Sequence, residues 1–150
     1  MRAVIQWVSQ AEVAIFGTVK STIQNGLLVL LAIEESDTAQ EIEWLSGKIV
    51  RLRIFNDEQG LMSRSLQETG GRILLVSQFT LFANTKKGNR PSFSRSAWPE
   101  VAVPLYEQFI RRLTEELGRS IQTGEFGADM KVGLTNDGPV TIIIDSKSRE

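Results

Sequence analysis

The segment Ile73-Leu74-Leu75-Val76-Ser77-Gln78-Phe79-Thr80-Leu81 decides how this chain folds. Its aliphatic half follows Gly70-Gly71, and this pattern predicts a buried strand over residues 72–82, entered from a tight turn. Polar side chains then occupy the far end of the predicted strand, at Ser77, Gln78 and Thr80. Because a polar group buried without a partner costs about 1–3 kcal/mol, such an end is either solvent-exposed or functional.

Short apolar runs separated by turn signals predict further strands on both sides of this segment. Gly17 predicts a hairpin turn, and Asn25-Gly26 is a strong turn signal before a continuous apolar run. A run of seven apolar residues is typical of a strand covered on both faces. The candidate strands are residues 2–8, 13–16, 19–23, 27–33, 54–55, 72–82, 119–123, 130–135 and 140–144.

Two stretches have helical periodicity. Thr38 with Glu41 forms a capping-box signature, and apolar residues follow at helical spacing, which predicts a helix over residues 38–52. A second helix is predicted from Pro99, which suits a first helical turn, to Gly118, a typical residue after a helix. We therefore predict an α/β domain with mixed β-sheets of about seven or eight strands and two main helices packed on one side.

Length and composition favour one soluble domain over residues 1–150. Apolar residues make up 41% and charged residues 23%, and no window approaches the ~18 apolar residues of a membrane span. The chain enters a strand-like pattern directly after Met1, so we expect a cytoplasmic protein without membrane contact. The net charge of −1 means that any RNA contact must be a local patch, and we expect no DNA partner.

The absence of histidine and cysteine restricts the chemistry. It excludes Ser-His and Cys-His nucleophile pairs and Cys/His zinc sites. Hydrolytic chemistry must then use hydroxyls, carboxylates, lysine, backbone amides or groups of the substrate. No close cluster of Asp and Glu suggests a magnesium or calcium site, so we expect neither metal nor cofactor.

Residues 84–99 form a long segment without periodicity, and long loops in compact domains are usually functional or disordered. Four basic residues lie in it without an acidic one: Lys86, Lys87, Arg90 and Arg95. Phe93 and Trp98 are interleaved with them. This mixture is typical of contacts to phosphates and stacked bases, although many basic loops are simply solvated.

Motifs along nearly the whole chain resemble the D-aminoacyl-tRNA deacylase family. The paired signatures are Ser77–Leu81 and Gly138-Pro139-Val140-Thr141. The further matching segments, in order, are Arg2–Gln6, Gly26–Leu31, Leu52–Phe55, Arg90–Phe93, Phe126–Met130 and Asn136–Thr141. The resemblance implies a homodimer that hydrolyses the ester between a D-amino acid, or glycine mischarged on alanine tRNA, and the 3′-terminal adenosine of tRNA.

The same resemblance implies roles for individual residues. The catalytic segment would be Ser77, Gln78, Phe79 and Thr80, facing Gly138 and Pro139 of the partner subunit as a chiral filter. The wall receiving the terminal adenine would be Phe126, Ala128 and Met130. The acceptor-stem phosphates would be held by Lys86, Lys87 and Arg90. Without the resemblance, Phe126 and Met130 read as core residues and Gly138-Pro139 reads as a turn.

An aminoacyl ester is already activated, so its hydrolysis needs mainly orientation and stabilisation of the developing oxyanion. Backbone amides of Phe79 and Thr80 can supply the donors. Thr80 as a nucleophile would need a base, and none lies nearby in sequence. We therefore favour Thr80 as an orienting hydroxyl with water activated by the tRNA's terminal 2′-OH, and keep a Thr80 ester intermediate as the alternative.

Two carbonyls, from Gly138 and Pro139, would bind the substrate's amino group and leave no room for an L side chain, whereas glycine would pass. The resemblance implies a cis Gly138-Pro139 bond. From sequence alone we expect trans, since only about 5–6% of X-Pro bonds in folded proteins are cis.

The chain departs from the family pattern at Trp7, where the family usually has an arginine that helps hold the Gly-Pro element of the partner. Tryptophan cannot form the forked hydrogen bonds of arginine. Trp7 therefore keeps open a relaxed editor of L-alanyl-tRNA, and a non-catalytic tRNA-binding dimer is a further alternative. Ser63, where asparagine is usual, is a smaller difference.

Overall fold

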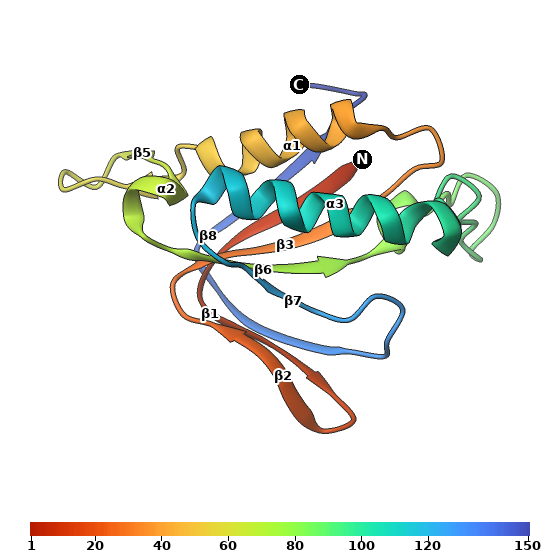
Figure 1. Ribbon diagram of the computed structural model, residues 1–150, viewed down its shortest axis with the longest axis horizontal. Helices are drawn as coiled ribbons and strands as arrows, with labels where there is room; N and C mark the ends of the chain where they lie inside the picture. Colours follow the sequence, from red (N-terminus) through yellow and green to blue (C-terminus); the bar gives the residue numbers. More distant parts are fainter.

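The computed structural model describes all 150 residues as one mixed α/β unit (Figure 1). The strands are β1 (Arg2–Ile15), β2 (Thr18–Ile23), β3 (Gly26–Ala32), β4 (Phe55–Asn56), β5 (Met62–Arg64), β6 (Arg72–Ser77), β7 (Gln122–Thr123) and β8 (Lys131–Asp145). The helices are α1 (Ala39–Arg51), α2 (Leu66–Thr69), the 3₁₀ turn η1 (Phe79–Phe82) and α3 (Pro99–Leu117). None of them is long and apolar enough to cross a membrane.

Six strands form one sheet in the order β2-β1-β3-β6-β7, and β8 pairs with β1 in addition. The pairings of β1 are all antiparallel, whereas β3–β6 and β6–β7 are parallel. β1 bonds β3 through its first half, β2 through its second half and β8 along nearly its whole length, so the sheet curls toward closure. The predicted mixed sheet is confirmed, and β4 with β5 forms a separate two-stranded ribbon.

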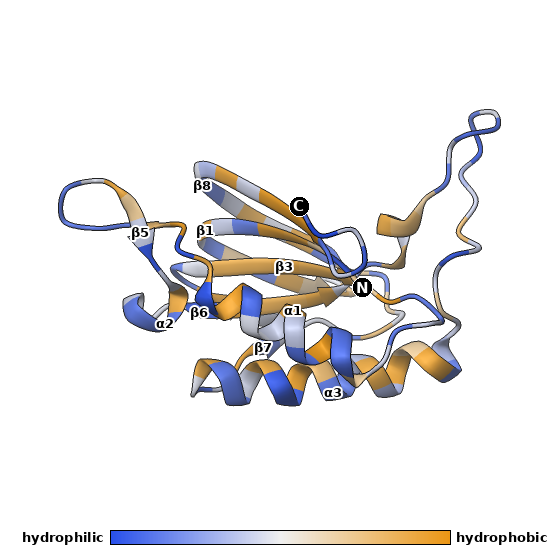
Figure 2. Cartoon of the chain, turned by 90° about the horizontal axis from the view of Figure 1, so that it is seen from above, coloured by the Kyte–Doolittle hydropathy of each residue, from blue (hydrophilic) through white to orange (hydrophobic).

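The central strands β3 and β6 are buried on both faces, as their continuous apolar runs predict (Figure 2). Leu27 and Val29 point into the main cluster under the helices. Leu28, Leu74 and Val76 point into a smaller cluster on the opposite face.

Helices α1 and α3 lie side by side over one face of the sheet, as predicted (Figure 1). Thr38 caps α1: its hydroxyl accepts from the Gln40 N–H (3.2 Å), while the Glu41 carboxylate accepts from the Thr38 N–H (2.6 Å). α3 begins at Pro99 and ends before Gly118, whose φ of 79° is left-handed. The four-residue helix α2 was not predicted, although Ser65 and Glu68 form a capping box there.

Several strand predictions are wrong in their bounds. The candidates at 2–8 and 13–16 are one unbroken strand, β1, and the candidate at 119–123 is a strand only over Gln122–Thr123. The strand expected over residues 72–82 ends at Ser77, because the chain closes the tight turn η1 directly after Gln78. The candidates at 130–135 and 140–144 are one strand, β8. β1 is long enough to pair with both halves, with register shifts next to Val8, and the 136–141 motif lies at that irregularity.

Candidate active site

The end of β6 and the turn η1 form one wall of a cavity. Ser77 is the last residue of β6, and Phe79 begins η1. Between them, the Gln78 N–H donates to the Leu31 carbonyl (2.7 Å), so the backbone next to β3 determines where the turn starts. The polar segment therefore reaches the cavity from a fixed strand end.

The opposite wall comes from the chain between β7 and β8. The cavity has a volume of about 300 Å³ and is lined by Val76, Ser77, Gln78, Phe79, Phe126, Gly127, Ala128, Asp129, Met130 and Val132. Two groups of predicted residues that are far apart in sequence, the Ser77–Phe79 segment and the Phe126–Met130 segment, thus share one cavity. Thr80 is not among the lining residues.

Phe126 and Met130 contribute to the core as well as to the cavity. The Phe126 ring lies 5.7 Å from the Tyr106 ring, and Met130 packs against the smaller apolar cluster. Burial raises the pKa of Tyr106 to about 12, so its hydroxyl stays neutral and donates to the Leu75 carbonyl (3.3 Å). The Phe126 and Met130 side chains are partly buried, so each packs inward on one side and faces the cavity on the other.

Thr80 has one side-chain partner. The Gln78 amide Nε2 donates to Thr80 Oγ1 (2.5 Å), and no carboxylate, lysine or second hydroxyl bonds to Thr80. The backbone N–H groups of Phe79 and Thr80 are the first two of the turn η1, and the first amides of a helical turn have no acceptor within the turn itself. The turn therefore has two backbone donors at its start and a hydroxyl held by an amide.

Ser96 holds the turn from outside, and the sequence did not reveal this residue. Its hydroxyl donates to the Phe79 carbonyl (2.8 Å). The Phe79 ring also meets the Phe93 ring edge-on, with 5.2 Å between centroids and 76° between planes. No local pattern marks a contact between residues this far apart along the chain.

The predicted phosphate-binding residues lie away from the cavity lining. Lys86, Lys87 and Arg90 are exposed and form no ion pair. They belong to the loop between η1 and α3, which projects from the body with a hydrophilic tip (Figure 2). An isolated bridge between Asn84 and Ser92 closes the base of this projection.

Gly138 and Pro139 are exposed on β8 and do not line the cavity of their own subunit. Their peptide bond is cis, as the resemblance implied, so the trans expectation from sequence alone is wrong. Trp7 does not bond either residue: its indole Nε1 donates to Asn25 Oδ1 (3.1 Å), and its ring meets Phe55 edge-on at 5.2 Å.

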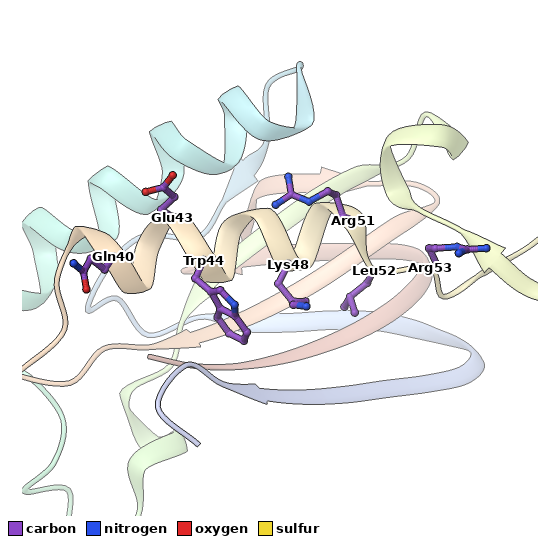
Figure 3. Close-up of a pocket in the computed structure, with 7 residues that line it drawn as sticks. All are labelled: Gln40, Glu43, Trp44, Lys48, Arg51, Leu52 and Arg53. Atoms are coloured by element: carbon purple, nitrogen blue, oxygen red, sulfur yellow. The ribbon is translucent and has the colours of Figure 1, made fainter. Parts of the chain in front are cut away.

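A larger groove, of about 590 Å³, lies along α1 (Figure 3). Trp44 lies in it between two cations, with Arg149 at 4.0 Å and Lys48 at 5.5 Å from the ring centroid. The Arg51 guanidinium at its edge pairs with Glu116 (2.9 Å). None of the residues predicted for the active site lines this groove.

The family model described as D-Tyr-tRNA(Tyr) deacylase matches residues 4–145. A D-aminoacyl-tRNA deacylase of Flavobacterium johnsoniae is 57% identical and one of Bacteroides fragilis 59% identical, each with 100% of both chains covered. The solved structure of a c-Myc DNA unwinding element binding protein has a TM-score of 0.90 at 42% identity, covering 97% of this chain and 98% of that one.

A probable eukaryotic D-amino acid tRNA deacylase has the same fold, with a TM-score of 0.81 at 19% identity over 95% of this chain and 97% of that one. Family model and full-length relatives agree with the motifs in Ser77–Leu81 and Gly138–Thr141. The chain therefore belongs to the D-Tyr-tRNA(Tyr) deacylase family and is a hydrolase of the D-aminoacyl-tRNA deacylase kind.

Proposed function

We propose that this protein hydrolyses the ester linking a D-amino acid, or glycine mischarged on alanine tRNA, to the 3′-terminal adenosine of tRNA. The observation that carries the proposal is the cavity shared by the Ser77–Phe79 and Phe126–Met130 segments. Its apolar wall suits an adenine ring, and its polar wall suits the ester. The products are free D-amino acid and tRNA, so the reaction removes D-amino acids before they enter translation.

The reaction uses backbone donors. The N–H groups of Phe79 and Thr80 at the start of η1 stabilise the oxyanion that develops as water attacks the ester carbonyl. The Thr80 hydroxyl, held by Gln78, orients the ester. It has no base beside it, which favours attack by water over attack by Thr80.

The base in this proposal is supplied by the substrate. The free 2′-OH of the terminal ribose lies next to the ester oxygen, so it can accept a proton from the attacking water and donate its own proton to the departing 3′ oxygen. A substrate that lacks this hydroxyl is then hydrolysed slowly even when it binds normally. This arrangement accounts for hydrolysis by a chain without histidine or cysteine.

Gly138 and Pro139 reach the cavity only from a second copy of the chain, since they lie outside it in their own subunit. A groove of about 860 Å³, lined by 13 residues of which seven are hydrophobic, lies along the C-terminal part of β8 and includes Val4, Leu81 and Ile143, of which Ile143 is 69% exposed. Two copies packed through this face would be related by a twofold axis. The Gly138 segment in the middle of each β8 would then approach the η1 turn of the other subunit.

In this dimer the carbonyls of Gly138 and Pro139 bind the amino group of the substrate and block the position of an L side chain. Gly138 has no Cβ, and an added Cβ would lie 2.8 Å from Val140 Cγ2. Larger residues would therefore displace the element that selects the D substrate. Glycine presents no side chain to this filter and passes it.

The test compares hydrolysis of D-tyrosyl-tRNA and L-tyrosyl-tRNA by the purified protein at one salt concentration. We expect fast loss of the D ester with the L ester spared. Attack on both esters, or on L-alanyl-tRNA in preference, would favour the relaxed editor. Binding without turnover under substrate excess would favour the non-catalytic tRNA-binding dimer.

Trp7 gives this chain a specific prediction. Its indole is held by Asn25 and Phe55, so it offers no guanidinium to the Gly138-Pro139 element. We expect Trp7→Arg to raise the D-over-L ratio of kcat/KM, because the filter gains charge-assisted hydrogen bonds. Trp7→Phe is the matched control and leaves the ratio unchanged; an unchanged ratio in Trp7→Arg contradicts the idea.

A further inference from the structure

The side chain of Trp98 is more exposed than its packing explains. Its side chain is 75% exposed at the start of α3. Burying a tryptophan removes a large apolar area from water, so a ring left this open forgoes most of that stabilisation. Two further aromatic side chains are exposed: Phe16, 97% exposed at the tip of the β1–β2 hairpin, and Phe79, 54% exposed in η1.

The backbone under Trp98 is held on both sides. The Trp98 carbonyl accepts from the N–H groups of Val101 (3.0 Å) and Ala102 (2.9 Å), which begin α3. On the other side, the Ala97 N–H donates to the Ile33 carbonyl (2.9 Å). The Trp98 ring therefore projects from a fixed point, so a ligand that stacks on it orders little additional chain.

This fixed point lies beside the candidate active site. Ser96, two residues before Trp98, donates its hydroxyl to the Phe79 carbonyl (2.8 Å), and Phe79 lines the cavity. Two residues span at most about 7 Å of extended chain. Trp98 is not among the lining residues of the cavity, and its backbone lies within this reach of Ser96, at the end of the loop that carries the basic residues.

The charge on this side suits nucleic acid. Lys86, Lys87 and Arg90 are exposed in the same loop without an ion pair. The fourth cation of the loop, Arg95, is engaged by Glu34 through two hydrogen bonds of 3.1 and 3.0 Å. Exposed cations and an open aromatic ring on one loop are the groups that bind single-stranded nucleic acid by phosphate contact and base stacking.

We propose that Trp98 stacks on an unpaired base of the tRNA 3′ end, next to the terminal adenosine in the cavity. This inference rests on the proposed function, because the cavity must hold the terminal adenosine for the preceding nucleotides to leave past Trp98. The contact adds affinity for the strand without touching the ester. Its effect therefore depends on how many nucleotides the substrate carries.

The experiment uses the full chain and two substrates, D-tyrosyl-tRNA and D-tyrosyl-adenosine. Trp98→Ala is expected to raise KM for the tRNA by roughly 5- to 150-fold, the range of one base–aromatic stack, with kcat unchanged. Trp98→Phe retains most of the affinity, because it keeps an aromatic face. The KM for D-tyrosyl-adenosine stays the same in all variants, and Phe16→Ala is the matched control for loss of an exposed aromatic ring.

A second readout does not need catalysis. In a Trp7→Phe, Trp44→Phe background, Trp98 is the only tryptophan, and a CCA trinucleotide is expected to quench its fluorescence while adenosine alone is not. Quenching without hydrolysis would sink the proposed function and keep the stacking site.

Four results would overturn the stacking site. One is an unchanged KM for D-tyrosyl-tRNA, and another is an absence of quenching. The third is an equal rise in the KM for D-tyrosyl-adenosine, which would make Trp98 part of the cavity itself. The fourth is dissociation of the Trp98→Ala protein in sedimentation, which would make the ring a protein contact.

Discussion

The Thr80 hydroxyl accepts a hydrogen bond from the Gln78 amide (2.5 Å). It can act either as a nucleophile or as a group that orients the ester. A threonine nucleophile is lost entirely when its hydroxyl is removed. An orienting hydroxyl contributes one hydrogen bond, while the amides of Phe79 and Thr80 remain. The two roles therefore predict different residual rates.

We expect Thr80→Ala to lower kcat on D-tyrosyl-tRNA by roughly 10- to 100-fold rather than abolish it, the loss of about one hydrogen bond to developing charge. Thr80→Ser keeps the hydroxyl and is the matched control. Single-turnover hydrolysis with the 3′-linked ester measures the rate. Complete loss of activity in Thr80→Ala, or a covalent tyrosyl-protein in the wild type, would instead support Thr80 as the nucleophile.

At the scale of elements, η1 is held in place by the ends of β1 and β8. The Arg2 guanidinium bonds Asp145 through Nε (3.1 Å) and donates to the Leu81 carbonyl in η1 (2.8 Å). It also lies 4.8 Å from the centroid of the Phe82 ring. The Arg2–Asp145 ion pair thus joins the Gln78–Leu31 and Ser96–Phe79 hydrogen bonds in fixing the position of the turn.

Burial acts to raise the pKa of Asp145, but hydrogen bonds from the Lys147 N–H and from Arg2 outweigh it and hold the pKa below its ordinary value of 3.8. A depressed carboxyl pKa gives stability that is present above the unfolded value and is lost as pH falls through the folded value. We expect Asp145→Asn to lower the unfolding free energy at pH 7 by about 1–3 kcal/mol.

The same variant should lower kcat. The difference in unfolding free energy between variant and wild type should shrink below about pH 3.8, as the wild-type carboxyl itself protonates. Chemical denaturation at pH 7 and pH 3 measures this difference. Asp57→Asn is the control: hydrogen bonding by Ser63 lowers the pKa of Asp57 too, but it lies in the β4–β5 loop and its loss should leave kcat unchanged. Equal loss of activity in both variants would contradict the role of Arg2 and Asp145.

At the scale of the molecule, the proposed dimer places the exposed face of β8 between two subunits. Ile143 is 69% exposed in a groove that also includes Val4 and Leu81. We expect Ile143→Asp to give a folded monomer, because the added charge opposes burial between subunits. The deacylation rate should fall as the dimer is lost, since each cavity would lose the partner's Gly138.

Sedimentation velocity measures the mass, and circular dichroism measures the fold. Val19→Asp, an equivalent change on β2 at a side chain that is 52% exposed, is the control and leaves both mass and activity unchanged. An Ile143→Asp monomer with full activity would contradict a site shared between subunits. An unchanged dimer would place the interface elsewhere.

Signals that act within a few residues were enough to define much of this protein. The capping box of Thr38 and Glu41, the left-handed Gly118 and the β3 apolar run placed both main helices and the centre of the sheet. Such signals need no distant partner, because the atoms that satisfy the backbone lie within one turn of helix. The motifs likewise indicated the family before any fold was known.

Tertiary contacts decided the rest. β6 stops at Ser77, β8 runs unbroken past Gly138, and Ser96 holds Phe79, because a strand's length and a loop's path depend on hydrogen bonds to chain far away in sequence. The side-chain pattern of a strand states which face is buried, but not which neighbour completes its ladder. Only the folded chain brings Ser77–Phe79 against Phe126–Met130 and leaves Gly138 outside the cavity of its own subunit.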